Sequence, residues 1–395
     1  MRQTCKGIDD DYLLSHRFRW LFCQLEVLRH CLPQSIRRTL HELPRSLDET
    51  YERVLNEIGP ANRDHVHRLL QCLTVAIRPL RVEELTEILV LDFDGAGGAI
   101  PMVNEDWQWE SPEQSMLSMC SSLITLVRDG DSCVIQFSHF SVKEFLTSDR
   151  LAARGGDASR FRIIFEPAHT TLAQACLEIL LQLDTGANSD QVDKIFPLAR
   201  YASRHWVEHA QFGTVSSQIE DGMRRLFDST RPYFLSWLLL HDIDDHWTSF
   251  GTYWIEHRGS PLYYASLCGF WDLAAHIVIE HPEQVNARGG LNHSPLTAAL
   301  HKRHFDVAEL LYLHGAAVDV TGFDNRTLLQ AASLDGLTHV VEWLIDHGAV
   351  SDSRQDSQTP SAATGHLPAV PTLLEHSVRI IHTNYVDYTL LNVAI

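Results

Sequence analysis

A repeat in the last third of the chain constrains its fold more than any other feature. A short triplet recurs at spacings of 34 and 33 residues, as Ser260-Pro261-Leu262, Ser294-Pro295-Leu296 and Thr327-Leu328-Leu329. Each triplet is followed by small residues and then by an apolar pair: Ile277-Val278, Leu310-Leu311 and Trp343-Leu344. A unit of this length cannot bury its own apolar face, so neighbouring units must stack on one another.

This period and this triplet are typical of ankyrin repeats, in which a helix, a turn, an antiparallel helix and a β-turn finger form one unit. We predict an ankyrin-repeat domain over 258–395, with three clear units. A fourth is degenerate, because Pro368 and Pro371 fall where its second helix should run. A fifth, from Thr389, is cut short. We therefore interpret the chain as part of something longer.

The protruding fingers are the natural contact positions of such an array, because exposed loops on a rigid scaffold often carry binding residues. The candidate partner-binding residues are Asn292, His293, Phe323, Asp324, Asn325 and Arg326. They could equally be ordinary exposed turns. Acidic residues outnumber basic ones across the three clear units, so the predicted concave surface favours a basic or neutral protein partner.

Charge and cysteine usage limit the class of protein further. The formal net charge is -19, from 32 Lys+Arg against 51 Asp+Glu. This argues against nucleic acid and anionic membranes as partners, since both attract positive charge. The 8 cysteines are scattered without a C-x-x-C pair and lie in apolar runs, which is typical of reduced core cysteines. We find no signal peptide and no apolar run long enough to span a membrane, and we expect a cytoplasmic location.

The first 257 residues predict a mainly helical fold with one β-hairpin. We divide them into a helical segment (1–62), a winged-helix-like domain (63–150) and a helical connecting region (151–257). Ser46 and Glu49 have the spacing of a capping box, and Ser141 with Glu144 predicts another. Two apolar runs around Asp129-Gly130 predict the hairpin. The third helix, 113–122, contains no Arg or Lys, so a packing module is favoured over DNA reading.

One constellation raises an enzymatic alternative. His205-Trp206-Val207-Glu208-His209 matches H-x-x-E-H, which on a helix would direct two histidines toward one zinc ion, with Glu208 as base. A third ligand cannot be identified. No Walker A loop and no G-x-S-x-G motif are present, so we assign no catalytic residue, no cofactor and no metal ligand.

Two further runs carry a resemblance to a known family. Residues 18–25 (FRWLFCQL) with 43–51 (LPRSLDETY) resemble the segment after the nucleotide-binding domain of fungal NACHT–ankyrin proteins. Residues 137–146 (FSHFSVKEFL) are similar to the end of their winged-helix region. The resemblance implies the C-terminal portion of a NOD-like receptor, without its phosphate-binding P-loop.

The leading hypothesis is a non-enzymatic protein-interaction scaffold, the sensor or regulatory part of such a receptor. Self-association through the N-terminal half is a further hypothesis. A zinc hydrolase and an inactive truncated gene product are the alternatives.

Overall fold

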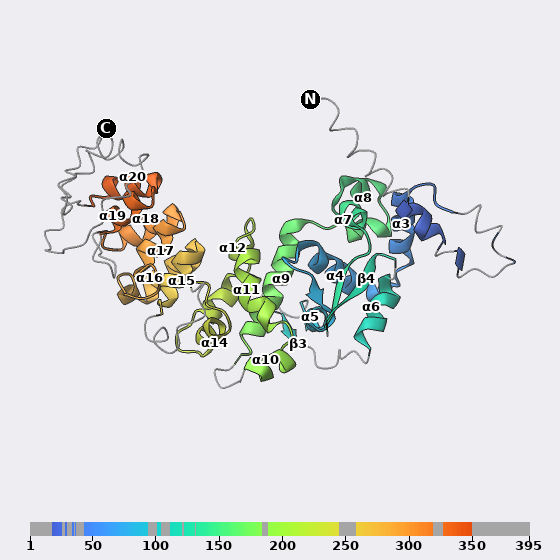
Figure 1. The fold of residues 1–395 in the computed structure, drawn as a ribbon, viewed down its shortest axis with the longest axis horizontal. Coiled ribbons are helices and arrows are strands. Elements are labelled where there is room, and N and C mark those ends of the chain that lie inside the picture. The colour runs from blue at the N-terminus through green and yellow to red at the C-terminus, as the bar shows by residue number, and fades with distance from the viewer. Residues whose placement is uncertain are drawn as a thin grey trace, which may run out of the picture. The chain divides into compact units, whose positions relative to one another are not determined.

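The computed structural model describes residues 18–25, 28, 29, 34, 36, 43–93, 101–103, 111–120, 122–130, 132–183, 189–244, 258–318 and 327–349. Contacts between residues divide the chain into two compact units, Met1–Gly222 and Met223–Ile395 (Figure 1), which are described separately. The domain boundaries expected at residues 62, 150 and 257 stay predictions.

Helix α3 (Leu47–Glu57) begins at the cap that its sequence predicts. The Ser46 hydroxyl accepts a hydrogen bond from the backbone N–H of Glu49 at 3.2 Å. The Glu49 carboxylate accepts in return from the backbone N–H of Arg45 at 2.7 Å, one residue earlier than in a standard capping box. The local pattern therefore fixes the start of this helix.

A winged-helix arrangement of three helices and a three-stranded sheet follows α3. After the 3-10 turn η1 (Pro60–Asn62), its elements are α4 (Arg63–Val75), β1 (Leu80–Arg81), α5 (Val82–Leu89), α6 (Pro112–Cys120), β4 (Ile124–Asp129) and β5 (Ser132–Phe137). The strand order is β1-β5-β4, with antiparallel neighbours.

The predicted hairpin is confirmed as β4 and β5, in which Asp129 pairs with Ser132. Gly130 has a φ of 59° between the two strands, a left-handed conformation that glycine adopts without strain. The short strand β1 was not predicted. Two more short strands, β2 (Leu91–Asp92) and β3 (Met102–Val103), pair antiparallel.

Helix α7 (Phe140–Thr147) corrects one prediction. Its N-cap is His139, whose Nδ1 accepts a hydrogen bond from the Ser141 N–H at 3.2 Å, so the predicted cap at Ser141 is wrong. The Ser141 hydroxyl instead lies 2.9 Å from the hydroxyl of Tyr51, in a buried contact with a residue 90 positions earlier. The spacing of residues within one helix cannot reveal a contact with a residue so distant in the sequence.

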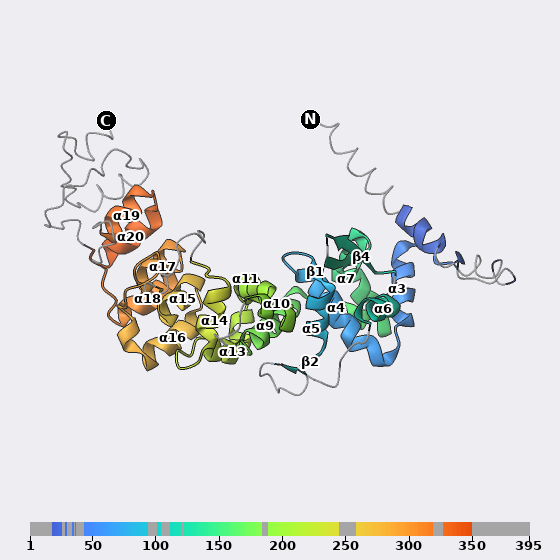
Figure 2. The same cartoon turned by 60° about the horizontal axis from the view of Figure 1, so that its bottom comes forward.

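Helix α9 (Phe165–Leu180) joins the winged helix to the helices that follow, because it packs against both α4 and α11 (Figure 2). Leu172, Cys176 and Leu180 are fully buried along it. The other elements of this part are α8 (Asp149–Arg154), the 3-10 turn η3 (Asp157–Phe161), α10 (Ser189–Ile195), α11 (Ala199–Ala210), α12 (Val215–Gln218) and α13 (Glu220–Leu226).

The second unit contains α14 (Tyr233–Leu240) and three helix pairs. The pairs are α15 (Pro261–Cys268) with α16 (Trp271–Glu280), α17 (Pro295–His301) with α18 (Phe305–Leu313), and α19 (Leu328–Leu334) with α20 (Thr338–Asp346). Helix α15 packs against α17, and α16 packs against α18 (Figure 2). The 3-10 turn η5 (Pro282–Gln284) follows α16. Phe234 and Trp237 of α14 place their rings 5.6 and 6.1 Å from the ring of Tyr264.

The three pairs repeat one local geometry. A hydroxyl caps the first helix of each pair by accepting the N–H three residues later, at 3.3, 3.2 and 3.3 Å, from Ser260, Ser294 and Thr327. A left-handed residue then ends that helix region, at φ values of 73°, 64° and 68°, in Gly269, Arg303 and Gly336. A backbone N–H closes each turn, at Phe270, His304 and Leu337. The period seen in the sequence is therefore a period in structure.

No helix among the described residues combines the length and the apolar character that crossing a membrane requires.

Candidate interaction sites

Two of the six predicted contact residues lie in the described part of the chain. Asn292 and His293 belong to the loop between η5 and α17, and both are half-buried. The other four, at positions 323 to 326, lie outside the described residues. Partner binding by all six stays a prediction.

Asn292 is held by an internal hydrogen-bond cluster. The Tyr263 hydroxyl donates to Asp244 at 2.6 Å and accepts from both the backbone N–H and the side-chain amide of Asn292, each at 3.0 Å. Asp244 is 8% exposed and also accepts the N–H of Leu291 at 2.7 Å. Burial raises the pKa of Asp244, although these hydrogen bonds oppose the shift. The side-chain amide of Asn292 therefore forms hydrogen bonds inside the protein that hold this loop in place.

Large apolar side chains are exposed instead on the second helices of the first two pairs. On α16, Trp271 is 46% and Ile279 is 75% exposed, and on α18 Leu313 is 71% exposed. Large exposed apolar side chains are enriched where proteins meet partners. These positions differ from the predicted contact residues, which lie in the fingers. Their spacing off the buried stripe of each helix is the signal that could have found them.

The H-x-x-E-H motif lies on α11, but its second histidine is occupied on both sides. The Nε2 of His209 lies 2.8 Å from the hydroxyl of Tyr201, and its Nδ1 lies 2.8 Å from the Nδ1 of His169. His209 is fully buried, and burial together with the neighbouring histidines lowers its pKa to about 3. In the part of the chain that the structure describes, no cluster of His, Cys, Asp or Glu has the makings of a metal site. The geometry therefore argues against the zinc alternative.

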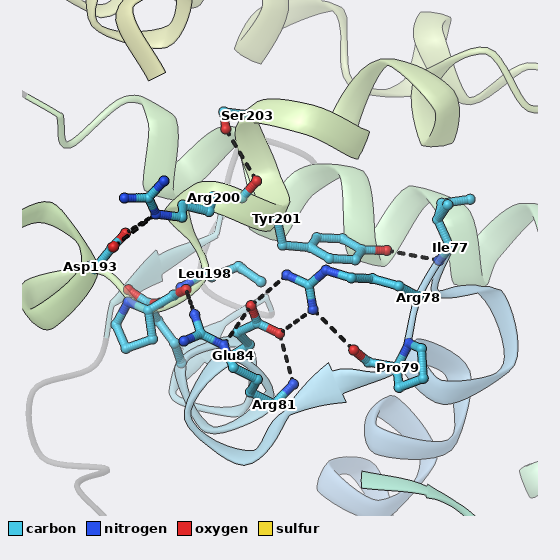
Figure 3. A network of polar contacts seen from close by, with 12 residues as sticks. Ile77, Arg78, Pro79, Arg81, Glu84, Asp193, Leu198, Arg200, Tyr201 and Ser203 are labelled. Atoms are coloured by element: carbon cyan, nitrogen blue, oxygen red, sulfur yellow. Dashed lines mark hydrogen bonds and ion pairs between the residues drawn. The ribbon is translucent and has the colours of Figure 1, made fainter. Parts of the chain in front are cut away.

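Tyr201 connects this helix to the winged helix. Its hydroxyl accepts the backbone N–H of Ile77 at 3.1 Å (Figure 3). It can therefore donate its own proton to His209, which leaves the other nitrogen of His209 to donate to His169. Burial raises the pKa of Tyr201 far above its usual range, so the phenol stays neutral. This chain of hydrogen bonds fixes one tautomer for each histidine.

A buried ion pair lies beside Tyr201. The guanidinium of Arg78 donates to both carboxylate oxygens of Glu84, at 2.9 and 2.7 Å, and stacks over the Tyr201 ring at 5.0 Å (Figure 3). Arg81 adds a bond from its Nε at 3.1 Å and one from its backbone N–H at 2.7 Å. Burial would raise the pKa of Glu84, but the two arginines outweigh it and hold that pKa below its usual value.

Glu87, one turn after Glu84 on α5, has the opposite surroundings. It accepts the backbone N–H of Leu198 at 2.6 Å, where α11 begins. Burial, aided by the negative charge of Glu84, raises the pKa of Glu87 to about 7. The guanidinium of Arg81 does not bond to Glu87. It donates to Glu84 and to the carbonyl of Pro197, the latter at 2.9 Å. The contact between α5 and α11 thus contains two carboxylates. The charge of Glu84 is neutralised by arginines, whereas Glu87 accepts only a backbone N–H among the described residues.

Two comparisons with known proteins gave matches, and one of them concerns the first part of this fold. Residues 52–162 match the family model described as the winged helix domain of GPI inositol-deacylase. The chain is also 34% identical over 299 residues to the azaphilone pigments biosynthesis cluster protein L of Monascus ruber. That match covers 71% of this chain and 61% of the relative, so the chain spans less than two thirds of the relative's length. The N-terminal region therefore contains a winged-helix domain similar to that of GPI inositol-deacylase.

Proposed function

We propose that this chain is a non-enzymatic interaction protein, that its helix pairs are ankyrin repeats, and that they bind a protein partner. The observation that carries this proposal is the repetition of one cap and one turn geometry in three successive helix pairs. Stacked repeats of this kind form extended binding surfaces. The exposed Trp271, Ile279 and Leu313 give such a surface apolar anchors.

Ankyrin repeats commonly have a His directly after a T-P-L triplet, and the first repeat replaces this His by a residue that can also form hydrogen bonds. Tyr263 stands where the pattern has His, and its hydroxyl accepts the N–H of Asn292 in the loop before the next pair. Thr297 and Gln330, at the equivalent positions, bond instead to their own caps, Ser294 and Thr327. The proposed array is thus linked by a side chain to the next loop at its first repeat.

We further propose that the chain is the sensor or regulatory part of a NACHT–ankyrin receptor and that it acts in the cytoplasm. The winged-helix match at 52–162 supports the winged-helix part of this proposal. The six cysteines that the structure describes, of which five are buried, form no disulfide, which is typical of a reducing compartment. Self-association through the N-terminal half remains part of the proposal, supported by exposed Phe18 and Phe22.

The test is affinity capture with the full chain from lysate of the source organism, read by quantitative mass spectrometry. The variant Trp271→Ser/Ile279→Ser removes two exposed anchors of α16 without opening the core. We expect it to lose, by about tenfold or more, proteins that the unchanged chain captures.

The matched control is Leu235→Ser/Leu239→Ser on α14, whose side chains are 49% and 54% exposed. It removes similar apolar surface outside the helix pairs and should leave the captured proteins unchanged. Equal capture by all three proteins would contradict binding through this face. Thermal melts of each variant separate lost binding from lost folding.

A further inference from the structure

A groove lies on the winged helix, outside the helix pairs, and nothing above assigns it a role. It is formed between α5, the start of α6 and the segment joining α10 to α11, and its cavity volume is about 530 Å³. Its lining combines apolar and acidic side chains. The apolar members include Val82, Pro112, Ile195 and Pro197. Ile195 is 64% exposed, so a large apolar side chain borders the groove without being covered.

Three carboxylates complete the lining: Glu83 and Glu87 from α5, and Glu113 from the first turn of α6. No lysine or arginine lines the groove within the described residues. The guanidinium of Arg81, next to Val82, donates to Glu84 and to the carbonyl of Pro197. The lining of the groove therefore combines apolar side chains with three carboxylates and no lysine or arginine among the described residues.

A comparison of Glu84 with Glu87 on the same helix shows that Glu87 lacks a cationic partner among the described residues. Arg78 and Arg81 neutralise Glu84, whereas the one hydrogen-bond partner that the described structure gives to Glu87 is the Leu198 N–H. A desolvated carboxylate with no cation is unfavourable, and a cation delivered from outside would relieve that cost. Charge complementarity thus selects the occupant.

We propose that this groove binds a peptide segment of a partner protein in which apolar side chains alternate with lysine or arginine. The apolar side chains rest on Pro112, Ile195 and Pro197, and the cations face Glu83, Glu87 and Glu113. The carboxylates of α5 and α6 repel phosphate, so this groove is suited to a basic peptide and not to a nucleic acid.

The test is fluorescence anisotropy of the full chain with a fluorescein-labelled peptide, Gly-Arg-Leu-Arg-Leu-Lys-Gly. We expect saturable binding that weakens as salt is raised, because surface charge pairs are screened. A Gly-Glu-Leu-Glu-Leu-Glu-Gly peptide and a Gly-Arg-Ser-Arg-Ser-Lys-Gly peptide should each bind at least about tenfold more weakly.

The decisive variant is Glu83→Gln/Glu87→Gln/Glu113→Gln, which should weaken the first peptide about tenfold or more. The matched control, Glu57→Gln/Glu178→Gln/Glu208→Gln, removes the same charge from α3, α9 and α11 and should bind as the unchanged chain does. A second variant, Thr86→Arg, places a cation of the chain itself in the groove and should also block the peptide.

Each other outcome overturns the proposal. No binding by the unchanged chain would mean that the groove is closed or covered by the chain itself. Equal binding by the decisive variant and its control would mean that the peptide responds to overall charge. Sedimentation supplies the last distinction: a dimer that the decisive variant alone dissociates would assign the groove to a second copy of this chain.

Discussion

The guanidinium of Arg78 grips the carboxylate of Glu84 through two parallel hydrogen bonds, at 2.9 and 2.7 Å, while its other face covers the ring of Tyr201. The Glu84 side chain is fully buried, whereas that of Arg78 is 39% exposed. An ion pair within the winged helix is therefore part of the surface that meets helix α11, through the contact of Arg78 with Tyr201.

Arg78→Met should destabilise the first unit, because it leaves a buried carboxylate with only Arg81 as its cation. We expect the free energy of unfolding to fall by about 2–3 kcal/mol, below the full value for a buried pair because Arg78 is partly exposed. Urea denaturation followed by circular dichroism measures it. Arg200→Met is the control: it breaks the exposed pair with Asp193 and should change stability by less than about 1 kcal/mol. Equal losses in the two variants would contradict a special role for the buried pair.

Glu87→Gln should stabilise the protein in a pH-dependent way. The folded-state pKa of Glu87 is raised to about 7, so its ionisation opposes folding as the pH rises from about 4.5 through 7. The Gln variant should thus gain up to about 3 kcal/mol at pH 8 and little near pH 4.5, while still accepting the N–H of Leu198. Chemical denaturation at the two pH values checks this. Glu83→Gln, on the exposed side of the same helix, should show no such difference.

His209 should make the fold acid-sensitive. Its pKa is lowered to about 3 in the folded state, so the folded protein binds fewer protons than the unfolded chain below about pH 6.5. Stability is then complete above pH 6.5 and falls by up to about 1.4 kcal/mol per pH unit below it. Burial also lowers the pKa of His169, which adds to the same loss. His209→Gln should flatten this dependence between pH 6.5 and 5, and an unchanged slope would contradict it. Imidazole nitrogen shifts in NMR should show neutral His209 at pH 5.

Gly290→Ala should destabilise the second unit. Gly290 has a φ of 70°, and a Cβ there would lie 2.2 Å from the ring of Tyr263. Backbone strain and this clash together should cost more than about 2 kcal/mol. Gly315→Ala separates the two effects, because φ is 89° there but nothing lies within 4 Å of the added carbon. It should cost about 1 kcal/mol. Differential scanning calorimetry of both variants makes the comparison, and equal shifts would mean that the clash is relieved.

The features that the sequence predicted well are those encoded within a few residues. The cap at Ser46, the hairpin around Gly130 and the recurring triplets each depend on neighbours three or four positions apart. The cap at His139 was missed because the hydroxyl of Ser141 meets Tyr51, far away in the sequence. The contact between α11 and the winged helix was not predicted for the same reason, because Tyr201 lies 124 residues after its hydrogen-bond partner Ile77.

The candidate sites follow the same rule. Asn292 was chosen as a contact because it belongs to a polar loop, yet its amide is directed to Tyr263 and Asp244, which only the fold brings near. The acidic groove brings α5, α6 and residues 195–197 together, and its lining is drawn from a stretch of more than 100 positions, from Val82 to Pro197. A sequence shows the charge of each segment but not that they line one groove.

The packing of α14 on the first helix pair decides where this chain can be cut. Phe234 and Trp237 cover the ring of Tyr264, and Asp242 accepts the hydrogen bond of the Tyr264 hydroxyl at 2.8 Å. A fragment beginning at residue 258, where the repeats start in the sequence, would expose the ring of Tyr264 and leave its hydroxyl without the Asp242 acceptor. A fragment beginning ahead of α14 keeps both covered, so an expression vector for the isolated repeats should start there.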